Sequence, residues 1–130
     1  MSNEQPSTGH SGRRTKDLGE RTKKFALQII RLYSALPKAT EARHLGRQVL
    51  RSGTSVGANY REANRARSKA EFIAKIGESL KELDETAYWL DLLAESGMAP
   101  KAPVLDLRDE CDQLLAIYTA ISKKSKASLA

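Results

Sequence analysis

Apolar residues recur every three or four positions in four separate stretches of the chain, which is the spacing of one side of an α-helix. In the first stretch Phe25, Ile29, Leu32 and Leu36 follow this spacing, and Pro37 interrupts it because proline cannot continue a helix. The pattern predicts a helix over residues 17–36.

The second stretch keeps a heptad spacing, but several members are small or polar: Ala42, Leu45, Val49, Ser52, Val56, Asn59 and Ala63. Gly46, Gly53 and Gly57 lie within it, and each costs a helix about 1 kcal/mol relative to alanine. Residues 51–57 could therefore form a loop. We favour one helix over residues 40–66, with Thr40 as its N-cap, because the spacing keeps its phase on both sides of the glycines.

The third and fourth stretches carry end signals as well as periodicity. Ser68 and Glu71 form a capping box, Gly97 suits the left-handed position after a helix, and Pro103 suits a first turn. These features predict helices over residues 68–97 and 103–124. Their apolar positions are Ile73, Ile76, Leu80, Leu83, Ala87 and Leu90, then Val104, Leu107, Cys111, Leu114, Tyr118 and Ile121.

Four amphipathic helices with short connections predict an all-α, up-down-up-down four-helix bundle. The chain has 130 residues, which suits one domain, and we place the bundle in residues 17–126. Residues 1–16 are polar and lack any hydrophobic period, so we expect a disordered tail there.

The cysteine content and the hydropathy favour a cytoplasmic protein. The one cysteine, Cys111, excludes an intrachain disulfide, which fits a reducing compartment. No apolar run has the length of a signal peptide or of a membrane span, so we expect no membrane partner.

Charge is distributed unevenly between the second and third predicted helices. The formal net charge is +6. Residues 38–69 hold eight basic and two acidic residues, whereas residues 71–97 hold two basic and seven acidic residues. One interpretation is that the two helices are neighbours whose flanks attract each other.

The other interpretation is a cationic stripe that binds phosphate, for which the planar guanidinium of arginine is well suited. The heptad places five arginines of the second helix at outward positions, and Arg67 follows in the next turn. The candidate nucleic-acid-binding residues are Arg43, Arg47, Arg51, Arg61, Arg65 and Arg67, with Lys23 and Lys24 as lesser candidates.

Residues 53–57 match the G-x-S-x-G pattern of serine hydrolases, with Ser55 as its nucleophile. That motif needs a strand before it and a helix after it, and no strand is predicted. We favour close helix packing for Gly53 and Gly57. No group of histidines, cysteines and carboxylates has metal-ligand spacing, so we expect a non-enzymatic protein without metal or cofactor.

Polar residues on or beside the second helix's apolar seam predict a buried polar network. Ser52, Ser55 and Asn59, together with Arg51 and Glu62, are expected to meet polar residues of the third helix and to fix the register between the two.

Three runs of the sequence resemble the bacterial four helix bundle protein family, also called the 23S rRNA-intervening-sequence protein family. They are Leu36-Pro37-Lys38 with residues 41–63 (EARHLGRQVLRSGTSVGANYREA), residues 68–73 (SKAEFI) and residues 81–90 (KELDETAYWL). The resemblance extends over residues 25–121. It implies a four-helix bundle that assembles into homopentamers and has no enzymatic activity.

The similar accessory protein of diversity-generating retroelements is thought to bind nucleic acid on a basic surface. The resemblance thus favours a homo-oligomer that contacts RNA or DNA phosphates without reading sequence. Two alternatives stay open: an adaptor that only assembles or docks a protein such as a reverse transcriptase, and an esterase that uses Ser55.

Overall fold

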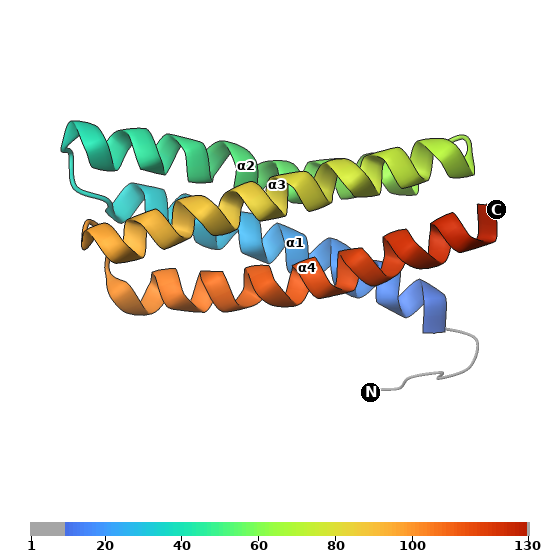
Figure 1. Cartoon of the computed structure of the whole chain (residues 1–130). Coiled ribbons are helices and arrows are strands. Elements are labelled where there is room, and N and C mark those ends of the chain that lie inside the picture. Colours follow the sequence, from blue (N-terminus) through green and yellow to red (C-terminus); the bar gives the residue numbers. More distant parts are fainter. Residues whose placement is uncertain (1–9, 130) are drawn as a thin grey trace.

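The structure, a computed structural model, describes residues 10–129, with side chains from Leu18 to Ser128. Its four helices follow in the order α1 (His10–Ala35), α2 (Thr40–Asn64), α3 (Lys69–Ser96) and α4 (Lys101–Leu129) (Figure 1). The described residues contain no strand. The predicted all-α fold is confirmed.

Helices that follow each other in sequence pack side by side, so the chain runs up, down, up and down. α2 packs against both α1 and α3, and α3 packs against α4. α1 and α4 complete the bundle with the smallest of the four helix contacts, and the diagonal helix pairs of the described chain do not pack together. The bundle is therefore most open along the side between α1 and α4.

The core is aliphatic along all four helices, as the periodicity predicts. The fully buried side chains include Phe25, Ile29, Val49, Val56, Ile76, Leu83, Leu90, Val104 and Leu114. Tyr60 was not among the expected core positions, yet it is buried and meets Tyr118 edge-on with ring centroids 5.9 Å apart. No helix of the described chain is both long and apolar enough to cross a bilayer.

The terminal helices extend beyond their predicted bounds. α1 begins at His10, inside the stretch expected to be a disordered tail, whereas residues 1–9 lie outside the described residues. α4 begins at Lys101 and continues to Leu129. Propagating a formed helix adds one hydrogen bond for each residue fixed. The added residues contain no proline, and Pro103 lies in the first turn of α4, where proline is tolerated.

The inner helix ends lie within two residues of their predicted bounds, but their caps differ in detail. Ala39 rather than Thr40 is the N-cap of α2, and it makes no side-chain capping bond. Ser68 Oγ accepts a hydrogen bond from Glu71 N, as predicted, whereas Glu71 Oε1 accepts from Arg67 N. Gly97 adopts the predicted left-handed conformation, with φ 74°.

The three glycines of α2 lie inside one continuous helix, and each makes room for a side chain of α1. A Cβ atom at Gly53 would lie 2.1 Å from Ile29 Cδ1, and one at Gly46 would lie 2.6 Å from Leu36 Cδ1. A Cβ at Gly57 would come within 3.1 Å of Thr22 Oγ1. The close approach of α1 offsets the helical cost of these glycines, and the loop alternative for residues 51–57 is excluded.

Candidate nucleic-acid interface

The cations of α2 fall into two groups according to the helix that they face. Arg51 faces α3, where its guanidinium bonds Glu82 Oε1 at 3.3 Å and also pairs with Glu85. One turn before the end of α2, Glu62 accepts from Lys75 Nζ of α3 at 2.6 Å, and this hydrogen bond raises the pKa of Lys75. Arg51 is exposed, as its outward position predicts, but its guanidinium is already paired with carboxylates of α3.

The other arginines of α2 and of its C-cap have no carboxylate partner within the described residues. Arg43 stacks over the ring of Tyr33 on α1, with its guanidinium carbon 5.4 Å from the ring centroid. Arg61 lies 18 residues later, which is five helical turns and therefore the same direction. Arg47 and Arg65 are related in the same way. We call these four residues the arginine flank: Arg43, Arg47, Arg61 and Arg65.

Three members of the arginine flank are exposed, namely Arg47, Arg61 and Arg65, and none of the four makes an ion pair within the described residues. The flank is interrupted in its middle. Arg47 and Arg61 are 14 residues apart, which corresponds to about 21 Å along the helix. The flank thus consists of one pair at each end of α2 rather than one unbroken stripe.

The remaining candidate cations lie outside α2. Arg67 is in the turn before α3, and its side chain is 92% exposed although its Nε lies 3.9 Å from Glu71 Oε1. A pair this long and exposed contributes little stability, so the guanidinium keeps access to a ligand. Lys23 and Lys24 are exposed on α1.

The expected polar network forms around Ser52 but does not include every residue named for it. Thr86 Oγ1 of α3 donates to Ser52 Oγ at 2.7 Å, and both side chains are buried. Ser55 instead donates to Arg51 O of its own helix at 2.7 Å. Asn59 is half-buried, and its side chain makes no hydrogen bond within the described part of the chain.

The α3 members of this network, Ser79 and Thr86, were missed in the sequence. Ser79 donates to Val56 O across the α2–α3 interface at 3.0 Å. The two residues are seven positions apart and both are buried. The same seven-residue spacing separates Ser52 from Asn59 on α2, and this matched pattern was the signal that could have revealed them.

The G-x-S-x-G run does not form a nucleophile elbow. Gly53 and Gly57 face α1 from the middle of α2, whereas the elbow is a sharp turn between a strand and a helix. Among the described residues, no three His, Cys, Asp or Glu side chains come close enough to hold a metal ion. Burial raises the pKa of the Cys111 thiol to about 12, which keeps it protonated at neutral pH.

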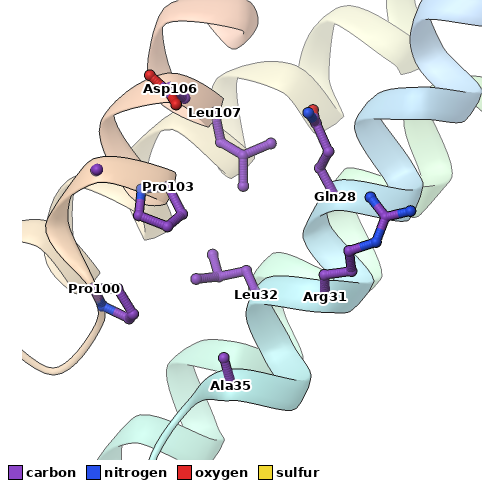
Figure 2. A pocket seen from close by; sticks show the side chains of 9 residues that line it. Gln28, Arg31, Leu32, Ala35, Pro100, Pro103, Asp106 and Leu107 are labelled. Carbon is purple, nitrogen blue, oxygen red and sulfur yellow. The ribbon is translucent and has the colours of Figure 1, made fainter.

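A pocket of about 420 Å³ lies on the open side of the bundle, between α1 and the beginning of α4. Leu32, Pro103 and Leu107 point into it, and Gln28, Arg31 and Asp106 lie around it (Figure 2). Most of its surface is apolar, and it does not gather the converging acid, base and nucleophile that a catalytic site needs.

Comparison with known proteins agrees with this architecture. The family model described as 23S rRNA-intervening sequence protein matches residues 15–120 of this chain. The chain belongs to the 23S rRNA-intervening sequence protein family. No match was found among curated proteins.

This chain is similar to a protein from Bacteroides thetaiotaomicron whose crystal structure is known. That protein is described as a protein with unknown function from the S23 ribosomal protein family. The two chains share 35% sequence identity and superpose with a TM-score of 0.75. The match covers 81% of this chain and 97% of the relative. The predicted family and bundle are thereby confirmed.

Proposed function

We propose that this protein is a non-enzymatic, homo-oligomeric module that binds RNA or DNA through phosphate contacts of the arginine flank. The observation that carries the proposal is the contrast between Arg51 and the arginine flank. Arg51 is neutralised by Glu82 and Glu85 of α3, whereas the arginine flank has no carboxylate partner in the described structure.

The mechanism is electrostatic and independent of base sequence. Each guanidinium that meets a phosphate releases condensed counterions, so affinity falls steeply with salt concentration. The planar guanidinium can bond two phosphate oxygens at once. The family's association with 23S rRNA intervening sequences makes RNA the first ligand to test.

Self-association fits the exposed apolar side chains and increases the field. Leu27 and Ile30, three residues apart on α1, are each 43% exposed, and adjoining exposed apolar side chains are a common feature of interfaces. A homopentamer, as the resemblance implies, would carry five times the formal charge of +6. Such a charge attracts a polyanion over long distances at low salt.

The test compares arginines of one helix that differ in their partners. We expect Arg47→Ala, Arg61→Ala and Arg65→Ala each to weaken binding to a 20-base-pair RNA duplex, and to reduce the slope of log affinity against log salt by about 1. Arg51→Ala is the matched control, because it removes the same charge from the same helix but a guanidinium that α3 already holds. Undetectable binding of the unmodified protein at 50 mM salt, or an equal effect of Arg51→Ala, contradicts the proposal.

A second candidate function is a protein-interaction adaptor, and the acidic α3 favours it. Tyr88 is 57% exposed and stacks edge-on against Trp89 with ring centroids 5.1 Å apart, on a helix with seven acidic residues. Light scattering with and without RNA separates the two functions. An increase in the mass of the oligomer on adding RNA supports nucleic-acid binding. An oligomer whose mass does not change with RNA, and which dissociates in the Tyr88→Ala variant, supports the adaptor function.

A further inference from the structure

One end of the bundle brings together segments that are far apart in sequence. The antiparallel order places the α2–α3 turn beside the C-terminal end of α4 (Figure 1). Lys69 Nζ, at the start of α3, donates to Ser128 Oγ, at the end of α4, at 2.8 Å. The last two turns of α4 therefore adjoin the turn that follows the arginine flank.

This end of the bundle is rich in exposed cations, and we call it the basic end. Its cations are Arg67, Lys69, Lys123, Lys124 and Lys126. The two carboxylates near the turn are already engaged. Glu62 pairs with Lys75, and Glu71 accepts from Arg67 N at 3.0 Å. The acidic residues of α4 all lie in its first half, at Asp106, Asp109, Glu110 and Asp112.

Helix dipoles alone do not explain where these cations gather. A basic residue near any helix C-terminus is favourable, and α2 and α4 end here with Arg61 and Lys126 in their last turns. α1 and α3 end at the opposite end of the bundle, and neither has a basic residue in its last turn. α3 even carries Glu95 there. The helices that end here thus carry a basic residue in the last turn, and the helices that end at the opposite end do not.

The basic end also continues the arginine flank. Arg61 and Arg65 lie about 21 Å or more from Arg47 along the α2 direction, whereas Arg67 is only two residues after Arg65, in the turn. A backbone of phosphates that leaves the arginine flank at Arg65 thus meets Arg67 and then the lysines of α4.

We infer that the basic end is a second phosphate-binding surface that continues the arginine flank, and that a nucleic-acid strand crosses it from the α2–α3 turn to the end of α4. The inference rests on the proposed function and assigns it a place that the α2 sequence alone does not indicate. The ligand groups are backbone phosphates, which fit mobile lysine ammonium groups as point charges.

The experiment compares two triple variants that lose the same charge at opposite ends. One is Lys123→Gln/Lys124→Gln/Lys126→Gln at the basic end. The matched control is Arg31→Gln/Lys38→Gln/Lys101→Gln, whose three side chains are also exposed. Affinity for a 20-base-pair RNA duplex is measured by fluorescence anisotropy between 50 and 200 mM salt, and circular dichroism checks that both variants keep their helices.

We expect the basic-end variant to lower the salt slope by about 2 to 3, and the control to change it by less than about 0.5. Equal losses would show that only net charge matters and would overturn the inference. If the unmodified protein binds and the basic-end variant binds equally well, the inference fails while the proposed function stands. If the unmodified protein does not bind at 50 mM salt, both fail.

A second measurement needs no variant. Acetylation of the unmodified protein with and without the RNA duplex is read by mass spectrometry for each lysine. We expect the duplex to protect Lys123, Lys124 and Lys126 and to leave Lys38 and Lys101 reactive. Uniform protection, or protection confined to Lys38 and Lys101, contradicts the assigned surface.

Discussion

Thr86 Oγ1 of α3 lies 2.7 Å from Ser52 Oγ of α2, and both side chains are buried in the helix interface. Each hydroxyl also reaches a carbonyl of its own helix, Ser52 to Gln48 O at 3.0 Å and Thr86 to Glu82 O at 2.7 Å. The pair therefore connects two helices without leaving a buried polar group unpaired, which is the condition under which a polar contact in a core is stabilising.

This pair predicts a measurable coupling between α2 and α3. Ser52→Ala and Thr86→Val should each lower the free energy of unfolding by about 1 kcal/mol. The double variant should lose less than the sum of the two, with a coupling of about 0.5–1.5 kcal/mol, measured by urea unfolding. Ser55→Ala is the control, because that hydroxyl bonds only its own helix, and its cycle with Thr86→Val should show no coupling. A coupling of the same size in both cycles would refute the interpretation.

The glycines of α2 and α3 predict opposite effects of the same substitution. A Cβ at Gly53 would clash with the buried Ile29, so Gly53→Ala should destabilise the protein by about 1–2 kcal/mol despite the better helix propensity of alanine. Gly77 has no atom within 4 Å of the same position, so Gly77→Ala should stabilise it by about 0.5–1 kcal/mol. Thermal unfolding of both variants tests this, and the prediction is wrong if Gly53→Ala raises the melting temperature.

Replacing the buried Tyr118 by phenylalanine should cost the protein little stability. Its hydroxyl is buried beside Ser79, yet within the described residues it makes no hydrogen bond of ordinary length. Removing an unsatisfied buried hydroxyl is neutral or favourable, so Tyr118→Phe should change stability by between zero and about +1 kcal/mol. A loss of more than about 1 kcal/mol in urea unfolding would mean that the hydroxyl has a partner in solution.

Cys111 predicts a loss of stability at alkaline pH. Desolvation raises the pKa of its thiol from the ordinary 9.0 to about 12 in the folded protein. Above pH 9 the unfolded chain releases this proton and the folded chain keeps it, so unfolding becomes more favourable as the pH rises through this window. The loss should reach about 1.4 kcal/mol by pH 10.

The measurement is the free energy of unfolding between pH 8 and 10 for the unmodified protein and for Cys111→Ala. The variant is less stable overall because it leaves a cavity, but its stability should decline less with pH. Equal pH dependence in the two proteins would show that the thiol does not contribute. The burial of Tyr118 also raises its pKa, which adds to the loss only at higher pH.

The helices themselves could be predicted from the sequence because their signals are local. Heptad spacing, Pro37, Ser68 and Gly97 each act within a few residues of their own position, and the structure follows them closely. The ends of α1 and α4 were harder to predict, since a helix that already packs extends at low cost through residues with no apolar period. The glycines were ambiguous for a related reason: their cost is local, but the contact with α1 that offsets it is not.

The candidate site divides in the same way. The sequence by itself determined how many arginines α2 carries and that they lie outside the seam, because helical periodicity fixes their direction relative to their own helix. Only the tertiary structure decided which of them are free. Each step of four residues rotates a position by about 40°, so Arg51 is turned by about 80° from Arg43, from α1 toward the carboxylates of α3. The adjacency of Lys69 and Ser128 likewise depends on helix packing, since contacts between residues so distant in the chain have no local signal.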